Sequence, residues 1–511
     1  MSVSSPSAVW LEKLRRPHFR ILFALSLANL CLIKIWHQAL ISTPASDPHR
    51  FLNSTAAILN TLIVAGVFFA MLSFASAYEN RLLQTTVQLG IVVPVVLILD
   101  GIRFNIGISP VEIAGQLFRA APLAIGIVAF LLLVKYRRTA MRLYTLLLLF
   151  LSPFILFTFG QAVTGLLTQR AVTMKAEENL SPIAPGSSGR ARVLWFIFDE
   201  LDQHVLFTER PSSLAVPEID RLRGEAFYAT KALPPADVTQ LSLPAYIAGE
   251  LVEDVRLVPN SASLRLHGSQ EYLPWGSRAN LFKDAIQAGI RTDLMGWYLP
   301  YCHVLGRYVA NCWDEFILDK PQLRKESLGD TMLTQLWELL PSSSRVQKID
   351  MYKTMLERTQ KAALDPGLGL VFVHWPIPHG PSIYDRNNDD FRISAKGGLD
   401  AYLDDVRLVD RTIGAIRQDM TAAGIWDKTT VLVTSDHFWR FAPGEKHQEI
   451  PFLLKLAGQQ QPLTYEQPFN TVIARSLVMA VLEGEVTTAE GVSTWLDRAA
   501  TGDGKLGTTL K

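Results

Sequence analysis

The sequence predicts a protein of two parts, an N-terminal bundle of about five transmembrane helices and a C-terminal α/β sandwich. Long apolar runs lie almost entirely before Gln169 in the 511-residue chain, and short apolar strands alternate with helical patterns after it. The 49 Lys plus Arg balance 48 Asp plus Glu, so the basic excess of a nucleic-acid-binding protein is absent. A composition of 49% hydrophobic and 19% charged residues also excludes a disordered chain.

The N-terminal part contains apolar runs close to the ~20 residues that cross a bilayer as a helix. They are residues 19–41, 56–77, 83–99, 120–134 and 143–167. The third and fourth runs are short, so a bundle of four spans is an alternative. The first run is long and is followed by further runs, which predicts an anchor rather than a cleaved signal peptide.

The distribution of basic residues predicts the orientation of these spans. With the N-terminus inside, the inner segments hold Lys13, Arg15, Arg16, Arg20, Arg81, Lys135, Arg137, Arg138 and Arg142, and the outer loops hold Arg50, Arg103 and Arg119. This asymmetry agrees with the positive-inside rule. An odd number of spans then places the C-terminal part outside. In a bacterium with two membranes, the protein would be a multi-pass protein of the inner membrane with its C-terminal domain in the periplasm.

Two ionisable residues, Lys34 and His37, lie in the outer half of the first apolar run. A charged group is costly at this depth unless it reaches the interface or faces a cavity. Snorkelling to the interface and a polar lining for a lipid headgroup are both open interpretations.

The three cysteines fit the predicted topology. Cys31 falls within a span, whereas Cys302 and Cys312 form an even pair in the outer part. An oxidising compartment would allow this pair to form a disulfide, and two free buried thiols are the alternative.

A Pro, Gly and Ser cluster at residues 181–189 marks the boundary between the two parts. We therefore divide the chain into a transmembrane domain (1–168), a linker (169–190), a catalytic domain (191–485) and a C-terminal tail (486–511). Apolar runs at 193–198, 368–373 and 430–434 predict buried strands, and helical periodicity covers 399–420 and 471–482. Buried strands that alternate with helices predict a largely parallel sheet between two helical layers.

Carboxylate and imidazole groups follow each of the three predicted strands. The first strand leads into Asp199-Glu200, the second into His374-Trp-Pro-Ile-Pro-His379, and the third into Ser435-Asp436-His437. Functional groups in such sheets gather beyond the carboxyl ends of the strands. Oxygen and imidazole ligands suit Zn, Mn or a similar divalent ion. Taken singly, each residue is more often a helix cap or a satisfied core group.

These residues resemble the motifs of the alkaline phosphatase superfamily, and within it the sulfatase-like fold of membrane-anchored phosphoethanolamine transferases and lipoteichoic acid synthases. The resemblance runs from about residue 193 to residue 482. It is carried by the segment 216–227, Thr239-Gln-Leu-Ser-Leu-Pro244, the His374-x4-His379-Gly-Pro pattern, Thr434-Ser-Asp-His437, and His447 ahead of Ile450-Pro-Phe-Leu-Leu454. The predicted spans followed by an outer domain also resemble that group.

The sequence departs from the family pattern at four points. Phe438 follows Ser-Asp-His where the family has Gly, and two acids, Asp199 and Glu200, stand where the transferases have one Glu. The chain has no Cys-x-Pro-x-Arg or Ser-x-Pro-x-Arg sequence, which counts against the formylglycine chemistry of sulfatases. The multiple disulfides typical of phosphoethanolamine transferases are also absent.

The resemblance implies a role for each site residue. It implies metal ligation by Asp199, Glu200, Thr239, Asp436 and His437, catalysis by Thr239, His379 and His447, and substrate binding by His374, His379 and His447. The implied ion is Zn or Mn, and a second ion bound by the histidines is an alternative. A helix N-cap is the structural alternative for Thr239.

The implied activity is phosphotransfer through a phospho-threonine intermediate. A phosphoethanolamine or phosphoglycerol headgroup would pass from a membrane phospholipid to a cell-envelope glycan or lipid. Two other interpretations remain: a membrane-tethered phosphodiesterase that uses water as the acceptor, and a vestigial, non-catalytic partner protein. Nothing in the sequence points to nucleic acid as a partner.

Overall fold

The structure is a computed structural model of the chain. It describes residues 16–42, 50–77, 87, 94, 98, 135–168, 191–258, 261–316, 327–340, 342–394, 396–442 and 447–502. The chain divides into two compact units. Unit 1 is Met1–Lys175 with Lys320–Ser343, and unit 2 is Ala176–Asp319 with Ser344–Lys511. Each unit is described by itself below.

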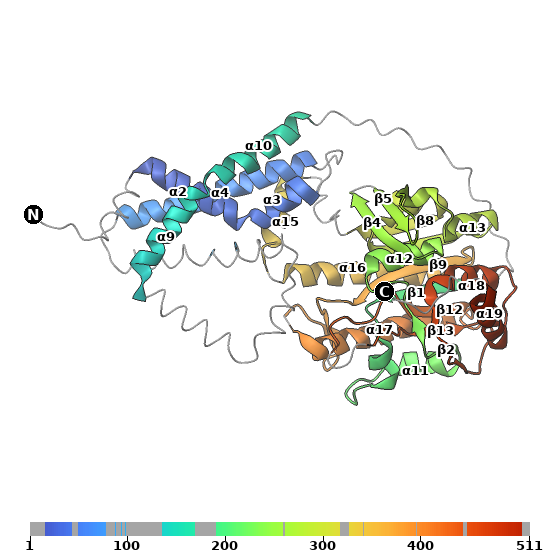
Figure 1. The fold of residues 1–511 in the computed structure, drawn as a ribbon. Helices are drawn as coiled ribbons and strands as arrows, with labels where there is room; N and C mark the ends of the chain where they lie inside the picture. Colours follow the sequence, from blue (N-terminus) through green and yellow to red (C-terminus); the bar gives the residue numbers. More distant parts are fainter. Residues whose placement is uncertain are drawn as a thin grey trace, which may run out of the picture. The chain divides into compact units, whose positions relative to one another are not determined.

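Unit 1 consists of apolar helices (Figure 1). They are α2 (Pro17–Cys31), α3 (Ile33–His37), the π-helical turn η1 (Gln38–Ser42), α4 (Arg50–Ala77), α9 (Arg137–Phe150) and α10 (Pro153–Thr168). Phe51–Phe74 and Arg142–Thr164 are long and apolar enough to cross a membrane, and a pair bent by 65°, Pro17–Cys31 with Ile33–Leu40, would make a third span. The predicted runs at 83–99 and 120–134, apart from single positions, and the linker at 169–190 lie outside the described residues. The five-span bundle therefore stays a prediction.

A helix from the second half of the chain, α15 (Leu328–Trp337), belongs to unit 1 and packs on α4. The Asn60 side-chain amide donates to Gln335 Oε1 at 3.1 Å, and Gln335 Nε2 donates to the Asn53 carbonyl at 2.9 Å. Lys34 Nζ donates to the Glu338 carbonyl at 2.8 Å. Three polar groups of the apolar helices are therefore bonded to a segment that sequence analysis assigned to the catalytic domain.

Unit 2 is built on an eight-stranded sheet with strand order β14-β2-β13-β12-β1-β9-β7-β8. The strands are β1 (Val193–Asp199), β2 (Phe227–Ala229), β7 (Thr292–Tyr298), β8 (Asn311–Phe316), β9 (Leu370–Pro378), β12 (Thr430–Ser435), β13 (Phe452–Lys455) and β14 (Leu463–Tyr465). The five strands from β12 to β8 run parallel, whereas β13 is antiparallel to both of its neighbours. The predicted α/β domain is confirmed, and its sheet is mixed.

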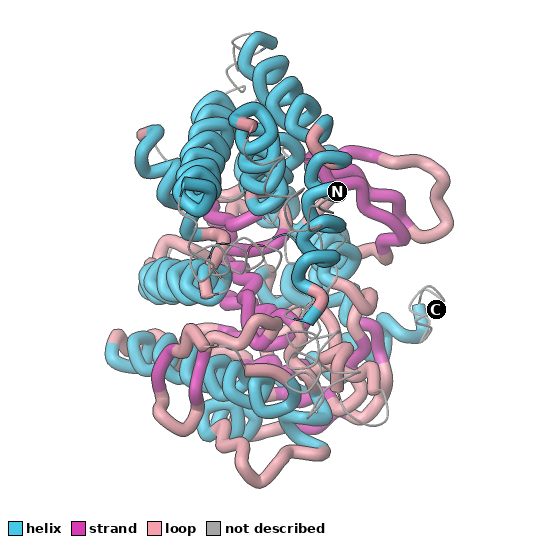
Figure 2. Tube along the Cα trace, turned by 90° about the vertical axis from the view of Figure 1, so that its left-hand side faces the viewer, coloured by secondary structure: helices cyan, strands magenta, loops and turns pink. Residues whose placement is uncertain are grey.

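The central strand β1 explains the layered architecture. Its residues are all buried, and their side chains alternate between two apolar cores. Trp195 and Ile197 belong to the core under α12 (Thr239–Ala248), α13 (Leu281–Gln287), α18 (Ala474–Leu482) and α19 (Ala489–Gly502). Phe196 and Phe198 belong to the core under α11 (Pro217–Gly224), α16 (Ser343–Leu364) and α17 (Gly398–Ala422). Figure 2 shows strands in the middle of the view with helices beside them, and further strands at the edge of the molecule.

The remaining elements of unit 2 are short. They are η2 (His204–Thr208), β3 (Ala232–Leu233), β4 (Val252–Val258), β5 (Ser261–Leu266), β6 (Leu273–Pro274), η3 (Trp275–Ser277), α14 (Tyr301–Leu305), η4 (Gly306–Tyr308), β10 (Tyr384–Asp385), β11 (Asp390–Phe391), β15 (Phe469–Asn470) and η6 (Thr471–Ile473). A disulfide between Cys302 and Cys312 joins α14 to β8, and Cys31 is a free, buried cysteine. Closing this short loop stabilises the fold by roughly 2 to 3 kcal/mol.

Candidate active site

Site residues meet at one edge of the sheet because β1, β9 and β12 are neighbouring parallel strands. Asp199 ends β1, and Asp436 and His437 follow β12 directly. His374 lies inside β9, opposite Ile197, rather than after the strand as the sequence suggested. His374 Nε2 lies 3.6 Å from Asp199 Oδ2, and His437 Nε2 lies 3.4 Å from Asp436 Oδ2. The sheet thus brings two carboxylates and two imidazoles together.

Thr239 lies at the first position of α12, after Val238. Its hydroxyl Oγ1 lies 3.4 Å from Asp199 Oδ2 and 3.2 Å from His437 Nε2, and the side chain is 7% exposed. The start of α12 therefore directs a buried hydroxyl at the carboxylate and imidazole groups. The family resemblance assigned this position to the nucleophile.

Three ligand atoms in this cluster are buried and lack a hydrogen-bond partner among the described residues: Asp199 Oδ1, His374 Nε2 and Asp436 Oδ2. One ligand atom from each of these residues lies within 4.8 Å of the others. Leaving buried charged groups without partners is expensive unless a cation compensates them. Carboxylate oxygens and an imidazole nitrogen bind Zn and Mn alike. The residues therefore fit a divalent metal ion.

The electrostatics of the two carboxylates point the same way. Burial disfavours the charged form of Asp199, but the His379, His374 and His437 imidazoles outweigh it and hold the pKa of Asp199 below its ordinary value. Burial and the neighbouring Asp199 carboxylate raise the pKa of Asp436. Two carboxylates that cannot both ionise easily in the free protein would do so beside a cation.

Glu200 is turned toward Arg440. Its Oε1 lies 3.2 Å from Arg440 Nε, and its backbone N–H donates to Asp436 Oδ1 at 3.1 Å. Its φ of +64° lies in the left-handed region, which costs a non-glycine residue on the order of 1 kcal/mol and is often found at functional sites. Glu200, which the sequence offered as a metal ligand, thus supports Asp436 through its backbone and pairs with Arg440 through its side chain.

Two aromatic residues, one near the end of β7 and one just after it, contact the histidines of β9 and its loop. The hydroxyl of Tyr301, which is fully buried, lies 3.0 Å from His374 Nδ1. This contact occupies one ring nitrogen and leaves His374 Nε2 for the carboxylates. The ring of Trp297 lies 5.3 Å from that of His379. Tyr301 therefore orients a candidate ligand, whereas Trp297 lines the site beside His379.

His379 is positioned by a buried ion pair that sequence analysis missed. Lys348 Nζ donates to the carbonyls of His379 and Pro381, and it lies 3.6 Å from Asp405 Oδ2. The His379 backbone N–H donates to the Asp199 carbonyl at 3.0 Å. Lys348 lies within the ordinary amphipathic pattern of α16, so the sequence carries no signal that distinguishes it from a surface lysine.

Asp405 holds the residues that follow His379. Its Oδ1 accepts hydrogen bonds from Ser382 Oγ and from the backbone N–H groups of Ile383 and Tyr384, at 3.0 to 3.1 Å. Burial raises the pKa of Asp405 to about 6, against the opposing effect of Lys348. The loop from His379 to Tyr384 is thus fixed by two buried charges of opposite sign.

His447 lies in a different group from the residues above. Its ring stacks on that of His204, with centroids 3.6 Å apart, and Glu209 completes this second cluster. The sequence grouped His447 with His374 and His379 as substrate-binding. The contacts that the structure records for His447 are instead with the segment just after β1.

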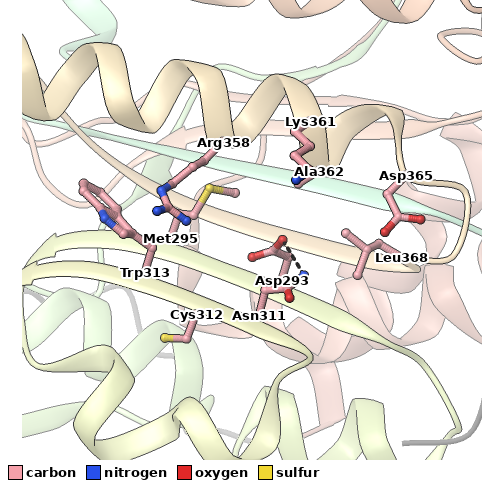
Figure 3. Close-up of a pocket in the computed structure, with 10 residues that line it drawn as sticks. All are labelled: Asp293, Met295, Asn311, Cys312, Trp313, Arg358, Lys361, Ala362, Asp365 and Leu368. Atoms are coloured by element: carbon pink, nitrogen blue, oxygen red, sulfur yellow. Dashed lines mark hydrogen bonds between the residues drawn. The ribbon is translucent and has the colours of Figure 1, made fainter.

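A separate pocket of about 310 Å³ lies between α16 and strands β7 and β8 (Figure 3). Its lining includes Asp293 near the start of β7, so it opens at the opposite end of this strand from the site. Arg358 of α16 and Trp313 of β8 lie next to each other, with the guanidinium 5.7 Å from the ring centroid. None of its lining residues belongs to the predicted site.

The fold and the candidate metal ligands together define a sulfatase-like domain with a metal site. The Sulfatase family model matches residues 193–499, which is more than half of the chain. The protein therefore belongs to the Sulfatase family, whose sulfatase-like relatives in the alkaline phosphatase superfamily are typically metal-dependent enzymes. The match ends within α19, beyond the boundary at 485 that we placed from the sequence. No curated protein matches the sequence.

Several solved structures have a similar fold at low identity. They include a protein in the alkaline phosphatase superfamily from Vibrio parahaemolyticus (13% identity, 61% of this chain and 72% of that chain, TM-score 0.39). The phosphonate monoester hydrolase of Agrobacterium radiobacter matches with 14% identity, 57% and 74% coverage and a TM-score of 0.37. The PsFucS1 sulfatase from Pseudoalteromonas sp. matches with 14% identity, 59% and 68% coverage and a TM-score of 0.41. These are similarities of fold alone.

Proposed function

We propose that this protein is a metal-dependent phosphotransferase that moves a phospho-headgroup from a membrane phospholipid to a glycan or lipid of the cell envelope. The observation that carries the proposal is the position of Thr239. Its buried hydroxyl lies 3.4 Å from Asp199 Oδ2 and 3.2 Å from His437 Nε2, beside three unpartnered ligand atoms. A threonine cannot be converted to the formylglycine of sulfatases, which favours phosphoryl over sulfate-ester chemistry.

Asp199, His374, Asp436 and His437 are the residues that would hold the ion next to Thr239. A bound divalent ion would stabilise the Thr239 alkoxide and the negative charge on the phosphoryl oxygens. A free threonine hydroxyl is a weak nucleophile at neutral pH and needs such activation. Glu200 supports this set through its backbone bond to Asp436.

The reaction has two half-reactions. In the first, Thr239 Oγ1 loses its proton and bonds to phosphorus, the bond from phosphorus to the diacylglycerol oxygen breaks, and that oxygen takes up a proton. In the second, the acceptor hydroxyl loses its proton and bonds to phosphorus, and Thr239 Oγ1 leaves and is protonated. We assign proton exchange with the leaving and entering oxygens to His379. Its imidazole is partly exposed and lies on the loop that Lys348 and Asp405 hold.

The N-terminal helices support a lipid donor and an envelope location. Two of them are long and apolar enough to cross a membrane. The Cys302–Cys312 disulfide suits an oxidising compartment such as the periplasm. We therefore propose a protein of the bacterial inner membrane with its Sulfatase domain outside the cytoplasm.

The experiment follows labelled diacylglycerol released from fluorescent phosphatidylethanolamine or phosphatidylglycerol by the detergent-solubilised protein with Zn or Mn. We expect Thr239→Ala to lower the rate at least a hundredfold and Thr239→Ser to retain measurable turnover. The control is Thr412→Ala, which removes a buried threonine hydroxyl 2.8 Å from the Tyr352 hydroxyl, away from the site. Turnover by Thr239→Ala at the wild-type rate would refute the proposal.

The same assay separates transfer from hydrolysis. Free ethanolamine phosphate or glycerol phosphate, formed in a Thr239-dependent manner without an acceptor lipid or glycan, would identify a phosphodiesterase. No diacylglycerol from either lipid with either metal would count against lipid-dependent transfer and would favour a different substrate or a non-catalytic protein.

A further inference from the structure

A second group of candidate metal ligands lies apart from the Asp199–His374–Asp436 group. One ligand atom from each of His204, Glu209 and His447 lies within 4.8 Å of the others. We infer that these residues form a second metal site, suited to a borderline divalent cation such as Zn²⁺. This inference does not depend on the proposed phosphotransfer.

The local fold brings these three side chains together. His204 begins the π-helical turn η2, and the Glu209 backbone N–H donates to the His204 carbonyl at 2.7 Å. One π-helical turn thus places Glu209 next to His204. Turns of this kind are frequent at functional sites. His447 comes from the segment before β13. A hydrogen bond from the Ile450 N–H to the Ala232 carbonyl, at 2.9 Å, holds this segment in place.

The two ring nitrogens of His204 have different surroundings. Its Nε2 lies 3.3 Å from Glu449 Oε2, whereas its Nδ1 is buried and has no hydrogen-bond partner among the described residues. When Nε2 carries the proton and donates it to Glu449, the lone pair of Nδ1 is free for a cation. A carboxylate behind a histidine is the common outer partner of zinc-binding imidazoles.

The two imidazoles lie close together. The ring centroids of His204 and His447 are 3.6 Å apart and their planes are 15° from parallel. An imidazole nitrogen binds a metal in the plane of its ring, so joint ligation of one ion requires one of the two rings to rotate about its side-chain bonds. Two histidines and a glutamate form a common zinc ligand set with room for a further ligand.

The site is open enough for an ion to enter. The side chain of His204 is 18% exposed and that of Glu449 is 31% exposed. A bound ion would tie the turn after β1 to the segment leading into β13. These two segments have no covalent link between them, so the ion would act as a local crosslink.

The test is metal content and thermal stability of the full-length, detergent-solubilised protein. The protein is stripped with a chelator, titrated with Zn²⁺, and analysed for bound zinc by elemental analysis. We expect His204→Ala and Glu209→Gln each to bind one ion fewer per chain than wild type and to lose part of the zinc-induced rise in unfolding temperature. The matched control is His303→Ala, which removes an exposed histidine elsewhere in the domain.

Asp436→Asn distinguishes this site from the central one. Loss of one ion in Asp436→Asn and of a different, additive ion in His204→Ala supports two sites. Wild-type zinc content in both Glu209→Gln and His204→Ala would overturn the inference, because Glu209 is exposed and its variant should fold normally. Loss of all zinc in Asp436→Asn would also overturn it, since a single site would then account for the binding.

Discussion

Thr239 is the residue on which the proposed chemistry depends, and its position follows from one helix start. Sequence motifs pointed to Asp199, Thr239, Asp436 and His437, and the structure places these four side chains together. The contacts of Glu200 with Arg440 and of His447 with His204 could not be read from the sequence. Motif spacing identifies which strand end a residue follows, but side-chain direction at that end depends on tertiary contacts.

Glu315 on β8 offers a pH-dependent test at the residue scale. Burial, followed by the charges of Asp350 and Asp314, raises its pKa from 4.5 to about 7. Between these values the folded protein binds the proton more tightly than the unfolded chain, so this group's contribution to stability is lost as pH rises toward 7. The Glu315→Gln variant lacks this titrating carboxyl, so it does not lose stability in this way as pH rises.

We therefore expect Glu315→Gln to gain stability relative to wild type as pH rises from about 5 to about 8, by about 2 kcal/mol after allowance for partial exposure. The measurement is the unfolding temperature of both proteins across this range. Glu253→Gln, which removes a carboxylate with 45% side-chain exposure from β4, controls for net charge. Parallel pH profiles for wild type and Glu315→Gln would contradict the assignment.

At the element scale, the site depends on how β9 and its loop are held. The sequence predicted a strand over 368–373, whereas β9 continues to Pro378 and carries His374 inside it. The apolar run that predicted the strand ends before His374, because histidine is polar. The pairing of His374 with Ile197 of β1 follows from the sheet and not from the sequence. The Lys348–Asp405 pair then fixes the loop beyond the strand.

Lys348→Met should lower kcat at least tenfold, because the His379 and Pro381 carbonyls lose their donor and Asp405 loses its counter-charge. Breaking a buried ion pair by removing one partner costs about 3 to 5 kcal/mol of stability. The matched control is Lys455→Met, which removes another buried lysine of the domain, on β13 near the Trp426 ring. Diacylglycerol release and unfolding temperature are measured for both variants.

The comparison separates positioning from stability. If Lys455→Met is destabilised to a similar degree but keeps its turnover, the loss of turnover in Lys348→Met results from displacement of the loop that carries His379. A shift in the pH dependence of kcat would further indicate that His379 has moved. Equal loss of activity in the two variants would mean that Lys348 serves stability alone.

At the scale of the whole molecule, the chain leaves unit 2 after Asp319 and returns to it at Ser344. The intervening α15 packs on α4, and Leu336 and Leu339 contact an apolar cluster of unit 1. The sequence predicted the two-part division from the distribution of apolar runs. It did not predict that α15 belongs to unit 1, because α15 has the composition of an ordinary amphipathic helix.

A fragment starting at Arg190 should therefore behave poorly in solution, since α15 would have lost its partner α4. We expect this fragment to self-associate in size-exclusion chromatography. Replacing residues 320–342 with a short Gly/Ser linker should restore a monomer. A monomeric fragment that retains α15 and has the same unfolding temperature as the linker version would contradict this expectation.

The central claim is a covalent phospho-Thr239 intermediate, and intact-protein mass spectrometry after a brief acid quench tests it most directly. The protein is incubated with phosphatidylethanolamine or phosphatidylglycerol and metal, and the modified peptide is then mapped. The account predicts that the mass of one phospho-headgroup appears on Thr239 with the preferred lipid and is absent from Thr239→Ala. Diacylglycerol release without any adduct on Thr239, or with an adduct on another residue, would contradict it.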